Sequence, residues 1–402
     1  MRMRRCGGLL GILGVAGLLA GSPALASAQP VRDSLPIQNV YPVGCDPNQA
    51  TRVNDLIKAI TDANSNSPAI VELAAGCVYT LTSANNTGVF GGNGLPVITG
   101  DVTIRGAFSV IERDSTAPEF RILEVDRGGS LTVAGVTVRD GAVSTVGGCY
   151  LADGGSLALT GSPVRDCQAT QGGGGVAVIA GGSATVRGGW ITGCTSNGPG
   201  GGIELMPGIQ PTTTTSGDSG QPNSVEVEHS VLAHDSAPEG GAVAIAQGTD
   251  VAGTLGSARG ARLSPGTRAW SLTGGVVELV SDYLAGDEAT SGGAIDNSGG
   301  YLLVMTSKLL LNVADGDGGA IWSDGDTAVR GSVIGQNVAL GDGGAIYNDG
   351  DVLLRNSIIS SNRAGDGGGI YNGGNAVAIV SIIAGNIPDN CAPPSSVPGC
   401  LG

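Results

Sequence analysis

The sequence has few aromatic and few basic side chains. Phenylalanine, tryptophan and tyrosine make up 3% of its 402 residues, and it contains only two lysines and two histidines. Its formal net charge is −15, so we expect it to repel nucleic acid and anionic membranes. After the amino-terminal segment, no apolar run reaches the roughly 18 residues that a membrane-spanning helix needs. These shortages argue against nucleic-acid binding and against a transmembrane segment in the mature chain.

The amino terminus predicts an export signal. Arg2, Arg4 and Arg5 precede a short apolar run, and Ala26-Ser27-Ala28 is a small-residue cleavage site. We therefore expect residues 1–28 to be a signal peptide. The rest of the protein would be secreted, extracellular or associated with the cell surface, where its seven remaining cysteines can oxidise.

Glycine, by contrast, is abundant: its 72 residues are well over twice the usual share. A glycine-rich phrase recurs along the chain, and each copy ends in an apolar anchor that follows Gly-Gly-Ala or Gly-Gly-Gly. Most anchors are 24 to 27 residues apart, but two gaps are 40 and 52 residues long. The shorter gap holds a Thr-rich insertion, residues 208–224, which predicts a surface loop. The longer gap is interpreted as two repeats, one of them too degenerate to show its anchor. The anchors are Val176, Ile203, Val243, Ile295, Ile321, Ile346 and Ile370.

A second mark is an asparagine that lies three residues after an apolar residue. In earlier repeats this position holds Cys167, Cys194, Asp235 and Asp287. Asparagine tolerates the positive φ of a tight corner, and stacked asparagine amides can bond along a column. We therefore expect a buried structural ladder at this position. Its members are Asn312, Asn337, Asn362 and Asn386.

These marks predict an all-β fold, a right-handed parallel β-helix of about eleven coils with three short strands per coil. The coils would stack at about 4.8 Å, the spacing of hydrogen-bonded strands. An amphipathic segment, Thr51 to Asn64, predicts a short helix that caps the amino-terminal end. We expect the cap and first coils over residues 29–95, the regular β-helix over 96–386 and a Cys/Pro-rich tail over 387–402.

The repeat also suggests how the cysteines pair. Two pairs are close in sequence, and a third pair would occupy the ladder position of adjacent coils, at a separation that suits a disulfide. Sequence alone does not set the connectivity, and one thiol of the seven stays free or pairs between molecules. The candidate disulfides are Cys45–Cys77, Cys391–Cys400 and Cys167–Cys194.

The motifs GGAI and Ile-x-x-Asn resemble the polymorphic outer-membrane protein repeat, which pairs GGA(I/L/V) with FxxN. Here Ile or Leu stands where that pattern has Phe. Residues 94–141 look like the opening coils of secreted bacterial proteins with a pectin-lyase-like fold. The resemblance implies a right-handed β-helix. It also requires that an enzyme be considered, because many proteins of this fold cleave acidic polysaccharides, either as lyases with calcium and a base or as hydrolases with paired carboxylates.

Three aromatic residues form the candidate ligand-binding site: Trp322, Tyr347 and Tyr371 directly follow successive anchors. If the anchors point inward, strand alternation turns these side chains outward. Their flat faces would suit sugar rings of an extended glycan, while the alternative is that they only stabilise neighbouring strands.

Three carboxylates form the candidate metal site. Asp317, Asp342 and Asp366 each lie four residues before an anchor. Stacked carboxylates repel one another unless they are solvated, bonded to corner amides or bridged by a cation such as Ca²⁺. His229 and His234 are interpreted as surface residues. The sequence offers no catalytic residue and no cofactor beyond that calcium.

Together these observations favour a secreted, non-catalytic β-helix that acts as an interaction or adhesion module, with an extracellular polysaccharide or a cell-surface protein as partner. A polysaccharide lyase or glycoside hydrolase with a diverged site is the alternative, and a purely structural envelope component is a third. The sequence does not identify the ligand.

Overall fold

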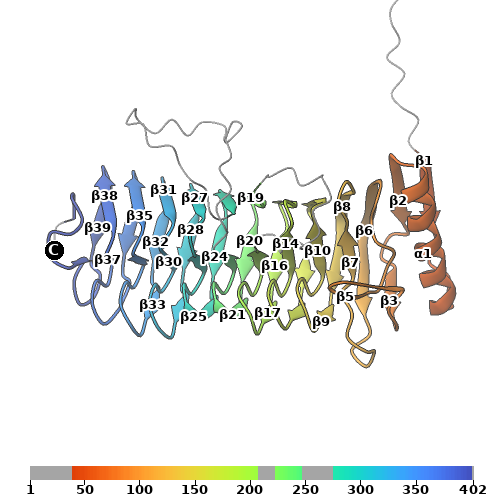
Figure 1. Ribbon diagram of the computed structural model, residues 1–402, viewed down its shortest axis with the longest axis horizontal. Helices are drawn as coiled ribbons and strands as arrows, with labels where there is room; N and C mark the ends of the chain where they lie inside the picture. The colour runs from red at the N-terminus through yellow and green to blue at the C-terminus, as the bar shows by residue number, and fades with distance from the viewer. Residues whose placement is uncertain (1–38, 207–221, 247–274, 401–402) are drawn as a thin grey trace, which may run out of the picture. The chain divides into compact units, whose positions relative to one another are not determined.

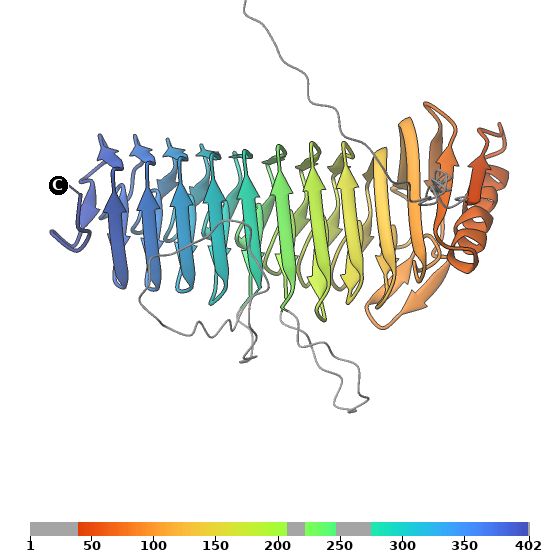
Figure 2. The ribbon, with the colours of Figure 1, turned by 90° about the horizontal axis from the view of Figure 1, so that it is seen from above.

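A computed structural model describes residues 39–206, 222–246 and 275–400. These residues form a parallel β-solenoid of about eleven turns with one helix. Its coils stack along one axis, with the helix at the amino-terminal end and the described residues up to 400 at the other (Figures 1 and 2). The expected signal peptide and most of the Thr-rich insertion lie outside the described residues. Among the described residues no helix has the length and hydrophobicity to cross a bilayer.

The regular coils have four faces rather than the three that the sequence predicted, although the first and last described coils lack a strand on some of them. Face 1 is the ten-stranded column, in chain order β7 (Leu123–Val125), β10 (Tyr150–Asp153), β14 (Val176–Ile179), β18 (Ile203–Leu205), β22 (Val243–Ile245), β26 (Ile295–Asn297), β30 (Ile321–Ser323), β34 (Ile346–Asn348), β37 (Ile370–Asn372) and β40 (Cys391–Ala392). Face 4 contains the shortest strands, which sequence patterns do not distinguish from turns: β9 (Ala142–Val143), β13 (Gln168–Ala169), β17 (Thr195–Ser196), β21 (Ser236–Glu239), β25 (Glu288–Ser291), β29 (Val313–Ala314) and β33 (Val338–Ala339).

Faces 2 and 3 belong to one sheet, because two long strands continue around the corner between them. Face 2 consists of β1 (Asn39–Val43), β2 (Ala69–Leu73), the first halves of β6 (Asp101–Arg113) and β8 (Ser130–Arg139), β11 (Ser156–Thr160), β15 (Ser183–Arg187), β19 (Ser224–Glu228), β23 (Val276–Val280), β27 (Tyr301–Met305), β31 (Asp326–Arg330), β35 (Asp351–Arg355) and β38 (Asn375–Ile379). Face 3 consists of the second halves of β6 and β8 with β3 (Val78–Leu81), β12 (Val164–Arg165), β16 (Trp190–Thr192), β20 (Val231–Ala233), β24 (Tyr283–Ala285), β28 (Lys308–Leu310), β32 (Val333–Gly335), β36 (Ile358–Ser360) and β39 (Ile382–Ala384).

The coils stack in register across both long gaps of the repeat. On face 1, Ile203 pairs with Val243, and Val243 pairs directly with Ile295. The interpretation of the 52-residue gap as two repeats is therefore wrong. It is one coil whose additional residues lie between the described segments. The β-ladder resumes in the same register because each strand needs only its neighbour to pair with.

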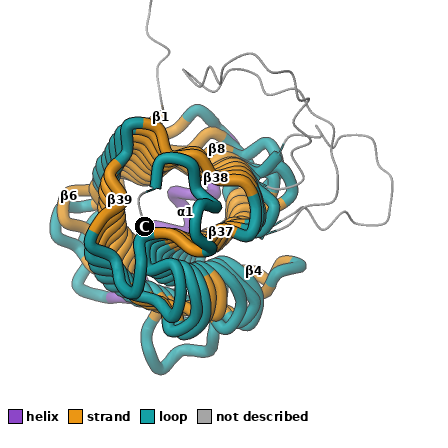
Figure 3. The backbone as a smooth tube through the Cα atoms, turned by 90° about the vertical axis from the view of Figure 1, so that its left-hand side faces the viewer, coloured by secondary structure: helices purple, strands orange, loops and turns teal. Residues whose placement is uncertain are grey.

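The core fills the inside of the tube that Figure 3 shows end-on. In β35, Val352 and Leu354 are 4% and 0% exposed, whereas the alternate residue Arg355 faces solvent. The same alternation repeats in each coil, so apolar side chains form one continuous core.

Three corners of each coil contain a residue with positive backbone φ. In one coil these residues are Gly343 (φ 69°), Asn356 (φ 51°) and Ser361 (φ 61°). The left-handed conformation turns the chain sharply, and glycine adopts it without steric cost. At the ladder corner the positive φ belongs to the residue before the asparagine, as at Gln336 (φ 60°). The expectation that the ladder asparagine itself adopts this conformation is wrong, because its amide must point into the tube.

The second glycine of each pair has a different role, because neighbouring coils approach it closely. A Cβ atom on Gly344 would lie 2.4 Å from the carbonyl oxygen of Gly368 in the next coil. The Gly-Gly pair that defines the sequence repeat therefore combines one positive φ with one close backbone contact.

The four expected ladder asparagines lie in one buried row. Each Nδ2 donates to the Oδ1 of the next asparagine, at 3.0, 2.9 and 2.9 Å from Asn312 to Asn386. Each Nδ2 also donates to a carbonyl of the preceding coil, as from Asn337 to Leu309 at 3.0 Å. The ladder thus satisfies buried backbone and side-chain groups together.

A second ladder, of serines, lies at the corner between faces 2 and 3. The backbone N–H of Ser307, Ser332 and Ser357 donates to the Oγ of the next serine at 3.1, 3.3 and 3.2 Å. This row was not predicted from the sequence. Its signal is the recurrence of serine at 24- and 25-residue intervals, in phase with the asparagines.

The single helix, α1 (Gln49–Ser65), covers the amino-terminal end of the tube, and its extent is close to the predicted one. It begins at Asn48, whose side chain accepts from the backbone N–H of Ala50 and Thr51. Leu56 and Ile60 are fully buried against the first coils. The helix therefore shields core side chains that would otherwise face water.

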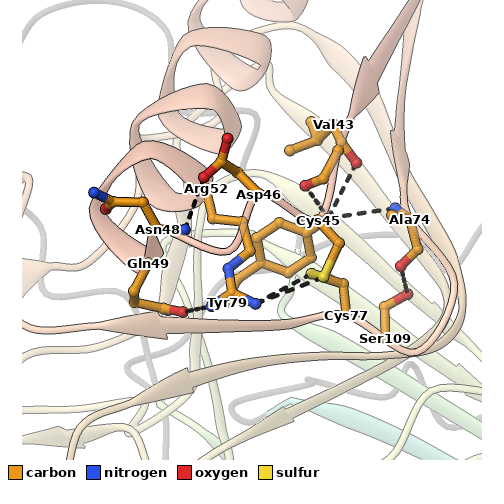
Figure 4. Close-up of a disulfide and its surroundings, with 11 residues drawn as sticks. Val43, Cys45, Asp46, Asn48, Gln49, Arg52, Ala74, Cys77, Tyr79 and Ser109 are labelled. Carbon is orange, nitrogen blue, oxygen red and sulfur yellow. Dashed lines mark hydrogen bonds between the residues drawn. A yellow bond between two sulfur atoms is a disulfide. The ribbon is translucent and has the colours of Figure 1, made fainter.

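Around this cap, a disulfide joins Cys45 to Cys77 (Figure 4). The guanidinium of Arg52 lies 3.6 Å from both sulfur atoms, and the hydroxyl of Tyr79 donates to the carbonyl of Val43 at 3.1 Å. These contacts hold the segment before the helix onto the first coils.

The other cysteines pair only partly as expected. Cys391 bonds to Cys400 and closes the tail, where β40 extends face 1 by pairing with β37. Cys167, however, bonds to Cys149, and Cys194 is a buried free thiol. The expected Cys167–Cys194 bridge is therefore wrong. Cys149 reaches Cys167 because its side chain also points into the tube, at a Cα separation of 5.6 Å.

Candidate functional site

On the outer surface of face 1, the kind of side chain changes from coil to coil. The residue after each anchor points away from the core, and these residues form one row from coil to coil. Between its end residues Glu124 and Ala392, the row changes from an apolar zone (Leu151 and Ala177) to an acidic zone (Glu204, Ala244 and Asp296) and then to an aromatic zone (Trp322, Tyr347 and Tyr371). The row consists of Glu124, Leu151, Ala177, Glu204, Ala244, Asp296, Trp322, Tyr347, Tyr371 and Ala392.

The aromatic zone contains the three residues singled out in the sequence. The rings of Trp322 and Tyr347 are 6.3 Å apart between centroids, those of Tyr347 and Tyr371 are 5.1 Å apart, and each pair is within 5° of parallel. Such distances mean offset stacking. Each ring therefore covers part of its neighbour, and all three side chains are only partly exposed. This differs from the expected flat platform.

Acidic side chains lie on both sides of this aromatic ladder. Asp317, Asp342 and Asp366 follow one edge, and Asp324 and Asp349 follow the other. Burial and then the charges of its two neighbours raise the pKa of Asp342. Burial and the nearby carboxylates, Asp349 first, raise the pKa of Tyr347 to about 12. The ladder therefore lies in a negative local potential.

The carboxylates of the first edge bond to the corner backbone. Asp317 accepts the backbone N–H of Asp342 in the next coil at 2.7 Å, and Asp366 accepts that of Gly367 at 3.1 Å. Within residues 39–206, 222–246 and 275–400, no three His, Cys, Asp or Glu side chains are grouped to hold a metal ion. The calcium expectation gains no support from this geometry.

In the acidic zone, two carboxyl groups lie two coils apart with Ala244 between them. Glu204 is 1% exposed, its Oε2 has no hydrogen-bond partner, and burial followed by the charge of Glu239 raises its pKa to about 8. Asp296 accepts from the hydroxyls of Ser291 and Ser298 at 2.6 and 2.7 Å. Burial raises its pKa to about 6, despite those two hydrogen bonds. Neither carboxyl was predicted as a site residue, although each directly follows an anchor, Ile203 or Ile295.

The apolar zone is covered by a hairpin of β4 (Asn86–Gly88) and β5 (Gly91–Asn93). Phe90 at its tip packs on the cluster that contains Leu151. Arg121, which is fully buried, holds the hairpin in place. Its guanidinium donates to the carbonyls of Phe90 and Gly147 and pairs with Glu124 at 3.2 Å. This zone is therefore structural.

The two histidines lie at corners, and both have positive φ, 52° at His229 and 58° at His234. Histidine is among the residues enriched in this conformation.

A groove of about 400 Å³ runs along face 4, and its lining includes Glu288, Thr290 and Asp315. Neither histidine lines it.

No protein family model, no curated protein and no solved structure matches this chain. The β-solenoid is thus established by the structure, whereas the resemblance to outer-membrane repeats and pectin-lyase-like proteins has no independent support.

Proposed function

We propose that this protein is an exported β-helical interaction module that binds an extracellular polymer through the aromatic ladder of face 1. One observation carries the proposal: Trp322, Tyr347 and Tyr371 stack in a partly exposed row, although large aromatics are scarce in the chain. Export is supported by the predicted signal sequence and by three disulfides, which suit an oxidising compartment.

The charges around the ladder define the kind of ligand. Carboxylates lie along both sides of the rings, and the whole chain is acidic. A neutral or amine-bearing glycan, or a basic segment of a cell-surface protein, suits this surface better than a polyanion such as pectin. Contact would be made by ring edges, by the outer faces of the two end rings and by the phenol hydroxyls.

A glycan array probed with the exported chain tests this proposal. The variant Trp322→Ala/Tyr347→Ala/Tyr371→Ala should lose at least tenfold in affinity for any glycan bound by the wild type. The matched control is Trp190→Ala/Tyr283→Ala, which removes two exposed aromatics of face 3 and should bind like the wild type. Unchanged binding by a folded triple variant would return the ladder to a purely stabilising role.

A second candidate, a glycoside hydrolase, is favoured by the carboxyls of the acidic zone. At about 4.8 Å per coil, the backbones of Glu204 and Asp296 are about 10 Å apart. Inverting enzymes hold their two carboxyl groups roughly 6.5–9.5 Å apart, a separation that these two side chains would reach by inclining toward Ala244. A pKa of about 8 would keep Glu204 protonated as a general acid. Release of reducing ends from the array glycans, abolished by Glu204→Gln, would support this function; binding without product supports the module.

A further inference from the structure

Two members of the buried amide ladder are aspartates instead of asparagines. Asp235 and Asp287 are both 0% exposed and continue the row that begins at Asn312. The backbone N–H of Cys194 donates to Asp235 Oδ1 at 2.7 Å, and that of Asp235 donates to Asp287 Oδ1 at 3.0 Å. The N–H of Asp287 donates to Asn312 Oδ1 at 3.1 Å. One oxygen of each carboxyl group therefore does what the asparagine Oδ1 does in the later coils.

The other oxygen occupies the place of the asparagine nitrogen. In the asparagine coils, Nδ2 donates both to the next Oδ1 and to a carbonyl of the preceding coil, as from Asn312 to the carbonyl of Leu284. The Oδ2 atoms of Asp235 and Asp287 have no partner. By the register of face 3, Leu232 lies under Asp287 as Leu284 lies under Asn312. An ionised Asp287 would therefore bring its Oδ2 against acceptors, with no hydrogen between them.

We infer that Asp235 and Asp287 are neutral carboxylic acids at neutral pH, that each donates an O–H along the ladder, and that this section of the solenoid loses stability as pH rises. A proton on Oδ2 supplies the donor that the ladder needs at that place. Without it, a buried acceptor is left unsatisfied and a charge is buried.

The surroundings of the two carboxyl groups support protonation. Asp235 is faced by Asp287 and by the thiol of Cys194, and from face 1 by Gly202, which has no side chain. Asp287 is faced by Asp235 and by the neutral Asn312. His234, next to Asp235 in the chain, is exposed at the outer corner.

The two carboxyl groups therefore have no cation beside them. Burial raises the pKa of both well above the ordinary range, and the charge of Asp287 adds to the rise at Asp235. Hydrogen bonds from Cys194 and Ala233 to Asp235, and from the N–H of Asp235 to Asp287, lower the two pKa values but do not cancel the effect of burial.

The direction of the pH dependence follows from linkage. An aspartate in the unfolded chain has a pKa near 3.9, so at higher pH the folded state holds more protons than the unfolded state. The stabilisation is complete below about pH 4 and is lost as pH rises through the folded-state pKa values.

The variant Asp235→Asn/Asp287→Asn tests the inference, because it extends the amide ladder without adding a charge. Its thermal midpoint should equal that of the wild type at pH 4 and exceed it by several degrees at pH 8. The reverse variant, Asn337→Asp, should steepen the loss of stability between these pH values. The infrared C=O stretch of protonated carboxyl groups should be present in the wild type at pH 7 and weaker in the double variant.

Parallel melting profiles of the wild type and the double variant would overturn the inference, as would an unchanged infrared band. A stoichiometric metal ion in the purified wild type, with loss of stability on chelation, would also overturn it by showing that a cation replaces the protons. If the double variant does not fold, the single variants decide, because Asp235→Asn or Asp287→Asn should each remove part of the band.

Discussion

The coils over residues 301–386 and the described coils between residues 190 and 300 share one geometry but differ in their polar groups. The later coils have complete asparagine and serine ladders and a period of 24 or 25 residues. The earlier ones contain Cys194, Asp235, Asp282 and Asp287 in the same rows, and the buried Oδ2 atoms of all three aspartates lack hydrogen-bond partners. The backbone stacking is thus the same whether the ladder position holds asparagine or aspartate, because both accept the N–H of the preceding coil. What the aspartate coils lack is the donor that the asparagine Nδ2 supplies to the next coil.

The largest effect should come from the close contact between coils in the regular region. Gly344→Ala would place a Cβ 2.4 Å from a backbone oxygen of the next coil, and we expect it to destabilise folding by about 3 kcal/mol. Gly44→Ala, which meets nothing within 4 Å, is the control. Denaturant unfolding measures both. Equal stability of the two variants would show that neighbouring coils can move apart enough to accommodate a Cβ atom at Gly344.

A smaller loss is expected from breaking the asparagine ladder. Asn337→Leu removes the acceptor for two donors of Asn312 and the donor to Leu309, so we expect about 2 kcal/mol of destabilisation. Thermal and denaturant unfolding both report this change. A result within experimental error would show that the regular coils do not depend on their ladder, which would erase the difference between the two regions.

The aromatic ladder should contribute less. Tyr347 stacks on both of its neighbours, and Tyr347→Ala should cost about 1 kcal/mol in the free energy of unfolding. Tyr283→Ala on face 3, where the side chain is 37% exposed, is the matched control and should cost less. An equal cost for the two would mean that stacking adds nothing beyond burial.

The smallest effect concerns facing carboxylates on face 2. Asp326 pairs with Asp351 in register, and burial followed by the charge of Asp351 raises its pKa to about 6. Stability is therefore lost as pH rises from about 4 through 6. Asp326→Asn should gain a few tenths of a kcal/mol at pH 8 and nothing at pH 4. A gain of the same size at both pH values would point to a cause other than charge.

Much of this fold was predictable because the residues that make the close contacts between coils recur at a regular interval in the sequence. The Gly-Gly pairs mark the tight corner, and the asparagine row marks the ladder. The pairing of Cys149 with Cys167 was not predictable, because it crosses the inside of a coil and has no period. Nor was the stacking of Tyr347, since register places its Cα atom but leaves the ring plane to the side-chain torsions.

The acidic zone of face 1 was equally hidden. Glu204 and Asp296 hold the position that the aromatics hold later, and only their burial distinguishes them from surface carboxylates. Burial depends on what neighbouring coils place around a side chain, which a single sequence does not specify. The candidate site was therefore visible where residues of one type recur and invisible where they do not.

Val243 pairs in register with Ile295, although 52 residues separate them in the sequence. The number of residues in the chain therefore does not fix the length of the solenoid. In a regular coil, two residues, Asp349 and Gly350, connect face 1 to face 2. The same junction accepts many more residues after Ile245, and the closure entropy of such a segment grows only by about 0.6 kcal/mol for each doubling of its length. This junction is therefore a place where evolution, or an engineer, can graft new sequence without redesigning the scaffold.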